Sequence, residues 1–240
     1  MADQPGLPLF LNIPVRSELV GLIEFYGQYW PLLMSGTGIT IAQFLLGAVL
    51  TVALALVFGL MKMSSNKLIK GSSVVYIEIF RGTSLLVQLY WIFFVLPLFG
   101  LTLEKFTAGW IAIGLNAGAY GAELVRGGIM AVPKGQWEAA TAINMSGARR
   151  MWRIILPQAL VNMLPAWGNL MIEILKGTAL VSLIAVTDLM FQAKQINAST
   201  YQSAQIFGAA LVIYYVLARF LLTPFLRWLE GFMAHKLGRA

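Results

Sequence analysis

Residues 138–160, which read EAATAINMSGARRMWRIILPQAL, form a polar and basic interval between two long apolar runs. The stretch opens with a helix-forming cluster, and we expect that helix to stop near Asn144, because asparagine tolerates the left-handed conformation found at helix C-termini. Ser146 is then placed to cap a second short helix. Spacings of three and four put the basic residues of this second helix on one face; they are Arg149, Arg150 and Arg153. The sequence therefore predicts a helix-turn-helix tied at both ends to apolar segments.

The composition of the whole chain indicates an integral membrane protein. Of its 240 residues, 59% are hydrophobic and 11% are charged, with a mean hydropathy of +0.77, whereas a soluble domain carries about 25% charged residues. A net charge of +7 suggests a nucleic-acid partner in a soluble protein. Here the basic residues cluster in loops, which is the pattern of cytoplasmic loops in membrane proteins. We therefore expect membrane lipid around the chain and no nucleic acid.

The apolar runs predict an all-α integral membrane fold with about five transmembrane helices. Each run reaches the roughly 20 residues that a helix needs to cross a bilayer. The expected spans are 39–61, 71–100, 106–130, 158–186 and 203–228, with a polar connection at 187–202 that is long enough for a short helix. Residues 1–30 contain no signal peptide but do carry an aromatic group of the interfacial kind. The expected domains are thus an N-terminal interfacial segment at 1–30 and a transmembrane domain at 31–240.

Lysine and arginine are distributed unequally between alternate loops. The loops at 62–70 and 133–157 and the C-terminal tail are rich in them, while the N-terminus, the loop at 103–105 and the connection at 187–202 hold few. The rich set is cytoplasmic by the positive-inside rule. Five spans put the two ends on opposite sides, so we expect the N-terminus outside and the C-terminus in the cytoplasm.

The stretch at 138–160 resembles the EAA loop of bacterial ABC-importer permeases, the segment that docks into a groove on the cytoplasmic ATPase. Glu138-Ala139-Ala140 and the Ile-Ile-Leu-Pro of 154–157 match the signature of that loop. Asn144 stands where the family has glycine, and asparagine is the next-best residue for a left-handed turn. The resemblance implies a coupling loop at 133–157 whose ATPase-coupling residues are Glu138, Ala139, Ala140, Asn144, Arg149, Arg150 and Arg153.

Other segments resemble the polar amino-acid subfamily of these permeases, which includes histidine, glutamate, glutamine, arginine and opine systems. They are RGTSLLVQ at 81–88, VPKGQ at 132–136 and KGTALVS at 176–182, although the subfamily more often has proline at 84 and aspartate at 177. The stretches EIFRGTSLLVQLYW and GLNAGAYGAELVRGGI look most like ectoine/hydroxyectoine permeases. The resemblance implies a permease subunit with the type I importer fold in the bacterial inner (plasma) membrane. Its implied activity is alternating-access import of a polar amino acid or similar small zwitterion.

The resemblance also implies partners: two copies of a cytoplasmic ATPase, a second permease subunit that is identical or homologous, and an external substrate-binding protein. The chain has no phosphate-binding G-x-x-x-x-G-K-[ST] loop, so we expect it to be no enzyme and to leave ATP and Mg to the partner ATPase. One histidine and no cysteine predict no metal site, no catalytic residue and no cofactor in this chain. The alternative function is an ATP-independent channel or solute pore, which has no need of a Glu-Ala-Ala loop.

Polar residues inside the expected spans indicate a substrate pathway, because each is costly in lipid unless it faces protein or water. They follow helical spacing on three spans and comprise Glu78, Arg81, Gln88, Asn116, Glu123, Asn169, Glu173 and Lys176, with Tyr120 between two of them. The alternative is that i,i+3 pairs such as Glu123–Arg126 only neutralise each other. Small residues at 114, 118 and 121 indicate either close helix packing or a subunit interface.

Overall fold

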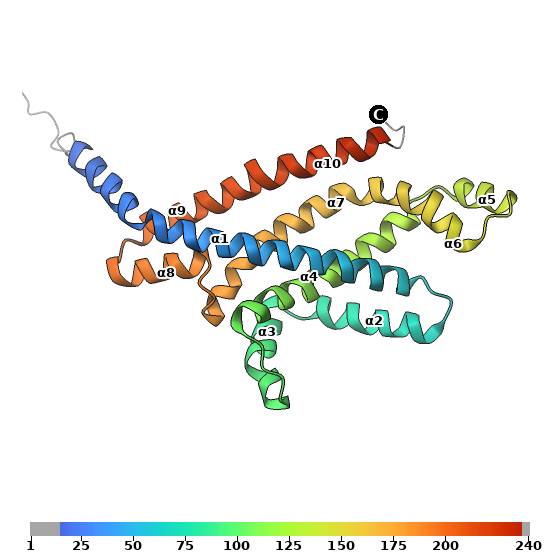
Figure 1. Cartoon of the computed structure of the whole chain (residues 1–240), viewed down its shortest axis with the longest axis horizontal. Helices are drawn as coiled ribbons and strands as arrows, with labels where there is room; N and C mark the ends of the chain where they lie inside the picture. The colour runs from blue at the N-terminus through green and yellow to red at the C-terminus, as the bar shows by residue number, and fades with distance from the viewer. Residues whose placement is uncertain (1–14, 237–240) are drawn as a thin grey trace, which may run out of the picture.

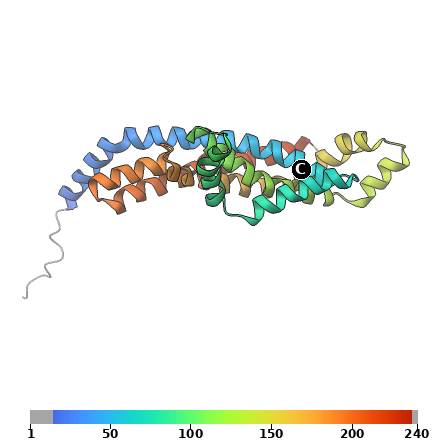
Figure 2. The same cartoon turned by 90° about the horizontal axis from the view of Figure 1, so that it is seen from below.

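The structure, a computed structural model that describes residues 15–236, is an elongated, thin arrangement of helices (Figures 1 and 2). Helices α5 (Lys134–Ala142) and α6 (Gly147–Arg150) form one end of the long axis. Helix α8 (Leu189–Thr200) lies at the opposite end, beside the first half of α1. Within residues 15–236 all regular structure is helical, which agrees with the predicted fold class.

Helix α1 (Val15–Lys62) is a single helix of 48 residues that contains Pro31. At 1.5 Å per residue it is about 72 Å long, more than twice the hydrocarbon thickness of a bilayer. The expected span 39–61 lies within it, and the domain boundary expected at residue 30 falls inside the same helix. Residues 1–14 of the expected interfacial segment lie outside the described residues, so the division at residue 30 stays a prediction.

Helix α4 (Lys105–Met130) runs through the centre of the molecule and contacts α1 along its length. A Cβ placed on Gly114 would lie 2.6 Å from Leu50, and one on Gly121 would lie 2.7 Å from Ala55. Only glycine permits this approach of the two backbones. The small-residue stripe thus packs helices of one chain together, which is the first of the two expected roles.

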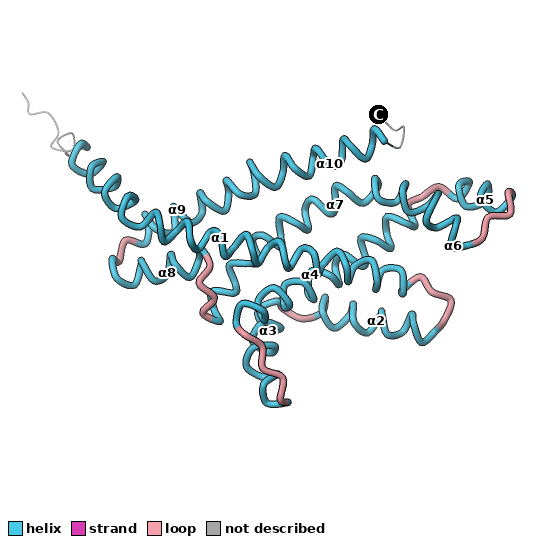
Figure 3. Tube along the Cα trace, in the orientation of Figure 1, coloured by secondary structure: helices cyan, strands magenta, loops and turns pink. Residues whose placement is uncertain are grey.

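The second expected span is broken, so the prediction of one continuous span at 71–100 is wrong. Helix α2 (Lys67–Gly82) has Thr83 as its C-cap. The axis of the following helical segment, Leu85–Phe99, makes an angle of 105° with that of α2. That segment comprises α3 (Leu85–Tyr90), a π-helical turn (Trp91–Val95) and a 3₁₀ turn (Leu96–Phe99). Figure 3 shows the short loop between α2 and α3, from which the segment leaves the main layer of helices.

The stretch after α5 forms one nearly unbroken helical path. Helix α6 passes through a π-helical turn (Met151–Ile155) into α7 (Leu156–Gly177), which ends in a 3₁₀ segment (Thr178–Ile184). The second short helix expected after Ser146 is therefore the first turn of a long one. Helix α8 is followed by α9 (Ser203–Val216) and α10 (Thr223–Lys236). A π-helical turn (Leu217–Leu222) joins α9 to α10.

Three helical stretches of the described chain are long and apolar enough to span a membrane: Ile23–Lys62, Gly147–Ile184 and Ser203–Met233. The bent pair at 67–99 makes a fourth candidate. Helix α4 has the length of a span, but its glycines and polar residues lower its mean hydropathy, and much of its surface is buried by its neighbours. The described chain thus holds three, or with the bent pair four, of the about five expected spans by length and hydropathy, and a crossing by α4 stays a prediction.

Candidate functional site

The chain turns sharply between α5 and α6, and this turn has the geometry that the sequence predicts. Asn144 has a φ of 58°. Its N–H donates to the carbonyl of Thr141 at 2.9 Å, and the N–H of Met145 donates to the carbonyl of Ala140 at 3.1 Å. This pair of bonds is the Schellman arrangement, which satisfies the last carbonyls of a helix. The left-handed turn at Asn144 is thus confirmed, while Ser146 occupies the N-cap of α6 without a side-chain hydrogen bond.

The three residues of the Glu-Ala-Ala motif differ in exposure. Glu138 and Ala139 are exposed, whereas Ala140 is only 2% exposed. Two large apolar residues near the turn are also open to solvent, Ile143 at 71% and Trp152 at 65%. A partner protein would therefore meet Glu138, Ala139 and these two apolar side chains. Ala140 packs within its own chain.

The three arginines do not act as one surface. The guanidinium of Arg150 lies 5.4 Å from the ring centroid of Trp137 and donates from Nη1 to Thr141 Oγ1 at 2.7 Å. Arg150 thereby ties α6 to α5, through a cation–π contact and a hydrogen bond. Arg149 and Arg153 are exposed, so these two remain to present positive charge outside the loop.

At the break between α2 and α3, side chains satisfy the carbonyls that the interrupted helix leaves free. Gln88 is buried, and its Nε2 donates to Phe80 O at 2.9 Å and to Thr83 Oγ1 at 2.7 Å. Asn116 Nδ2 of α4 donates to the same Phe80 carbonyl at 3.1 Å. The last carbonyls of a helix need such partners when the helix ends away from water. The stripe expected to carry Glu78, Arg81 and Gln88 on one helix is therefore divided between two.

A cavity of about 290 Å³ lies beside this break. Its polar lining comes from Thr83 and Ser84 at the break, Asn116 and Tyr120 on α4, and Glu173 on α7. The cavity thus brings together residues from three of the expected spans. A carboxylate, an amide and hydroxyl groups in one cavity between helices can bind a small polar molecule.

Other predicted pathway residues do not line the cavity. Arg81 is exposed at the end of α2, with its guanidinium 5.4 Å from the centroid of the Tyr120 ring. Asn169 and Lys176 are exposed on α7, on either side of Glu173, and Glu78 is exposed on α2. In the described part of the chain neither Glu78 nor Glu173 forms an ion pair, so the alternative, i,i+3 pairing with Arg81 and Lys176, does not hold for them. Exposed charges at this level of the helices require protein or water beside them, not lipid.

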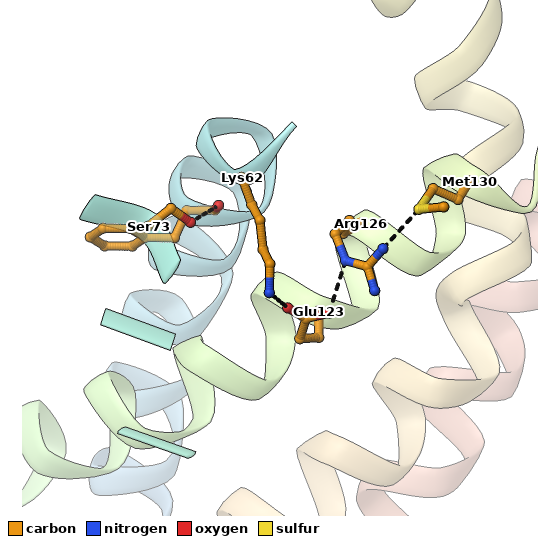
Figure 4. A network of polar contacts seen from close by, with 6 residues as sticks. Lys62, Ser73, Glu123, Arg126 and Met130 are labelled. Atoms are coloured by element: carbon orange, nitrogen blue, oxygen red, sulfur yellow. Dashed lines mark hydrogen bonds and ion pairs between the residues drawn. The ribbon is translucent and has the colours of Figure 1, made fainter. Parts of the chain in front are cut away.

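Glu123 lies apart from the cavity, at the end of α4 nearer the coupling loop. It accepts from Lys62 Nζ of α1, and its Oε2 accepts from Arg126 Nε at 2.9 Å (Figure 4). The expected pairing of Glu123 with Arg126 is confirmed, with Lys62 as an additional partner. The structure therefore does not bring Glu123 together with the other predicted pathway residues.

Asp188, which was not predicted as a site residue, lies at the end of the molecule opposite the coupling loop, where it caps α8. It is fully buried and caps α8 by accepting from Phe191 N at 2.9 Å and Met190 N at 3.3 Å. The hydroxyl of Tyr214 on α9 donates to it at 3.5 Å. Burial raises the pKa of Asp188 to about 6, against the lowering effect of these hydrogen bonds. An aspartate directly before an apolar helical run is an N-cap signal that could have identified it.

Helix α1 contributes directly to this buried cluster. Thr40 Oγ1 accepts from the N–H of Leu189 at 3.1 Å, and a Cβ on Gly36 would lie 2.9 Å from the Asp188 carbonyl oxygen. Lys194 Nζ donates to Ser182 Oγ at 2.9 Å nearby. The long α1 is thus anchored at this end as well as near the coupling loop. Among the described residues no group of three or more acidic or histidine side chains could hold a metal ion.

Comparison with known proteins gives matches over most of the chain. Residues 51–235 match the family model described as "Binding-protein-dependent transport system inner membrane component". A probable amino-acid ABC transporter permease protein of Sinorhizobium fredii, y4tF, is 43% identical over 225 residues, which are 91% of this chain and 93% of that protein. The L-cystine transport system permease protein TcyB of Bacillus subtilis is 39% identical over 191 residues, covering 79% of this chain and 82% of that one.

A solved structure matches in fold as well as in sequence. It is described as the crystal structure of an amino acid ABC transporter with histidines, and it superposes with a TM-score of 0.79 at 42% identity. The match covers 85% of this chain and 95% of the other. The superposition therefore takes in most of the helices of both chains.

Proposed function

Since the chain belongs to the family of binding-protein-dependent transport system inner membrane components, we propose that its loop at 133–157 couples it to an ATPase that drives import of a polar amino acid or similar small zwitterion. As a member of this family the chain is the amino-acid permease subunit of an ABC transporter, a multi-pass inner-membrane protein and not an enzyme. ATP and Mg are held by the partner ATPase in this proposal, and no cofactor is assigned to this chain.

One observation carries the proposal: both helices that flank the coupling loop contribute to the lining of the cavity. Helix α4 ends at Met130, just before the loop, and carries Asn116 and Tyr120. Helix α7 begins at Leu156, within the end of the loop, and carries Glu173. A displacement of the loop therefore moves both walls of the cavity, because packed helices shift as rigid elements between discrete arrangements. Closure of the ATPase dimer is the displacement that we propose.

The cavity chemistry supports a zwitterionic substrate. Glu173 offers a carboxylate to an ammonium group, and the Asn116 amide has a second N–H, beside the one that bonds the Phe80 carbonyl, for a substrate carboxylate. Arg81, whose guanidinium lies over the ring of the lining residue Tyr120, adds a positive charge beside it. Ectoine and hydroxyectoine are the substrates of the permeases that two stretches of the sequence look most like. These compounds and the amino acids of related systems are all small molecules that carry both a positive and a negative charge.

The proposed partners follow from the surfaces that remain open. The exposed charges of α2 and α7 need a second permease subunit, identical or homologous, with a water-filled path between the two. Glu138, Ala139, Ile143 and Trp152 supply the docking surface for one of two ATPase copies. In this proposal the end of the molecule that carries α8 and the start of α1 faces outside, where an external binding protein delivers the substrate.

The proposal is tested by uptake into proteoliposomes that hold the permease with its ATPase and binding protein, with labelled cystine, glutamate, glutamine, histidine, arginine and ectoine as substrates. We expect ATP-dependent uptake of one of these compounds. Glu173→Gln should lower it roughly tenfold, because an unmade hydrogen bond costs on the order of 1–3 kcal/mol. Asn169→Leu, one helical turn away on α7 and outside the cavity lining, should lower it less. Basal ATP hydrolysis should be retained in both variants.

Glu104→Gln is the matched control, because it removes the same charge from an exposed residue outside the cavity lining. Unchanged uptake in Asn169→Leu and Glu173→Gln would remove the substrate pathway from this part of the chain. Uptake that proceeds equally without ATP would favour the channel alternative.

A further inference from the structure

The contacts around Glu123 have no place in the substrate pathway described above. Lys62, the last residue of α1, donates to Glu123, which also accepts from Arg126 Nε at 2.9 Å. Arg126 Nη1 lies 2.8 Å from Sδ of Met130, the last residue of α4 (Figure 4). The chain of contacts thus runs from the end of α1 along the last two turns of α4. It finishes just before the coupling loop.

The ion pairs of this cluster are largely withdrawn from water. The side chains of Lys62 and Glu123 are 19% and 18% exposed, and that of Arg126 is 34% exposed. An ion pair in such a position is screened less than a surface pair. Removal of one partner leaves a charge that is partly buried and uncompensated. The contact between Lys62 and Glu123 therefore resists separation more than an exposed pair does.

Backbone contact reinforces the same junction. Gly59 lies one turn before Lys62, and a Cβ there would come within 2.9 Å of both the Ala122 carbonyl oxygen and Val125 Cβ. Helices α1 and α4 thus touch at backbone level directly beside the ion pairs. Close-packed interfaces of this kind transmit displacement, because their interiors are nearly incompressible.

Helix α2 is attached to α1 at the same level. Ser73 Oγ donates to the Phe58 carbonyl at 2.6 Å, and the ring of Tyr76 stacks on that of Phe58 with 3.9 Å between centroids. The Tyr76 hydroxyl also donates to the Leu115 carbonyl of α4 at 2.7 Å. From this attachment α2 runs to its break at Thr83 and Ser84, which line the cavity.

We propose that Glu123 is a positioning residue for ATP coupling. Its ion pair with Lys62 joins the end of α1, to which α2 is attached through Ser73, to the end of α4, where Glu123 also pairs with Arg126. A displacement of the loop at 133–157 then reaches the broken span as well as α4 and α7. The proposal rests on the proposed function, since it requires an ATPase on that loop. Loss of the Lys62–Glu123 ion pair leaves the docking surface intact and uncouples ATP hydrolysis from transport.

The test is a double-mutant cycle on the assembled importer in proteoliposomes, with the amino acid that the wild-type importer takes up. Uptake per ATP hydrolysed and co-purification of the ATPase are measured for Glu123→Gln, Lys62→Met and the double variant. Each single variant should keep the ATPase and lose about tenfold in uptake per ATP, and the double variant should be no worse than the singles. Lys70→Met, which removes an exposed cation from the same basic turn, should keep the wild-type ratio.

Several outcomes overturn the proposal. A wild-type ratio in Glu123→Gln and Lys62→Met does so, as does an equal loss in Lys70→Met, which would reflect overall charge alone. Loss of ATPase co-purification in both single variants would place the cluster in the docking surface instead. If Glu123→Gln fails to insert, Lys62→Met decides, because it leaves the Glu123–Arg126 pair in place. Failure of the proposed function itself is recognised separately, since the wild-type importer then shows no ATP-dependent uptake.

Discussion

The coupling loop and the broken second span are both interruptions of helices, but they are specified in different ways. The turn of the coupling loop is set by residues within a few positions of it, namely Asn144 in the left-handed conformation and the two backbone bonds around it. The break at Thr83 is held by Gln88 from the following helix and by Asn116, which lies 36 residues from its acceptor. Local chemistry ends the first helix, and tertiary contacts end the second.

The cavity lies at the break between α2 and α3 and not at the turn of the coupling loop. A turn that satisfies its own hydrogen bonds leaves its outer surface free to bind a partner protein. At the break, side chains of neighbouring helices donate the hydrogen bonds that the interrupted helix lacks. Polar side chains and backbone carbonyls therefore lie against each other inside the bundle. Interrupted helices in membranes are tolerated only where neighbouring protein or water satisfies the backbone. The cavity at Thr83, Asn116 and Glu173 is therefore a direct product of the break.

Replacement of Gln88 by leucine is the strongest test of this difference. It removes the Nε2 donor that bonds Thr83 Oγ1 and Phe80 O, the second of which then keeps only Asn116, and each lost hydrogen bond costs about 0.5–1.5 kcal/mol. We expect the thermal unfolding temperature of the purified permease to fall and uptake to be lost. Gln28→Leu, at an exposed site of α1, is the control and should change neither. An unchanged unfolding temperature in Gln88→Leu would show that the break does not depend on tertiary capping.

Substitutions of Asn144 test the locally specified turn and should have smaller effects. Valine at a φ of 58° costs about 1–2 kcal/mol through its branched Cβ. Glycine adopts this conformation freely and should be nearly neutral. Limited proteolysis of the loop at 133–157 should be faster in Asn144→Val than in wild type and unchanged in Asn144→Gly. Equal cleavage of all three proteins would contradict the local origin of the turn.

The sequence predicted those parts of the fold that depend on short-range patterns. Apolar runs predicted the three continuous spans that contain 39–61, most of 158–186 and 203–228, and the left-handed preference of asparagine predicted the turn at Asn144. The break at Thr83 was not predicted, because the apolar run continues through it and its capping groups come from elsewhere in the bundle. The link from Lys62 to Glu123 joins residues 61 positions apart, and no periodicity within a helix reveals such a pair.

The candidate site shows the same limit. Residue types and helical spacing identified Asn116 and Glu173 as polar groups in spans, and the structure places both at one cavity. The inward position of Ala140 and the contact of Arg150 with Trp137 depend on how α5 packs against α6 and the turn after it. Spacing alone puts Arg149, Arg150 and Arg153 on one face and cannot show which of them is used within the loop.

Co-purification of the ATPase with an Ala139→Trp permease tests the coupling role of the loop at 133–157 most directly. Ala139 is exposed, so an indole there blocks the docking surface without disturbing the packing that a substitution of the buried Ala140 would disrupt. Ser65→Trp adds the same group to an exposed residue of the 62–70 loop and serves as the control. We predict that Ala139→Trp inserts normally but loses the ATPase and substrate-stimulated ATP hydrolysis, while Ser65→Trp keeps both. Full ATPase binding and full stimulated hydrolysis in Ala139→Trp would contradict the coupling role of the loop.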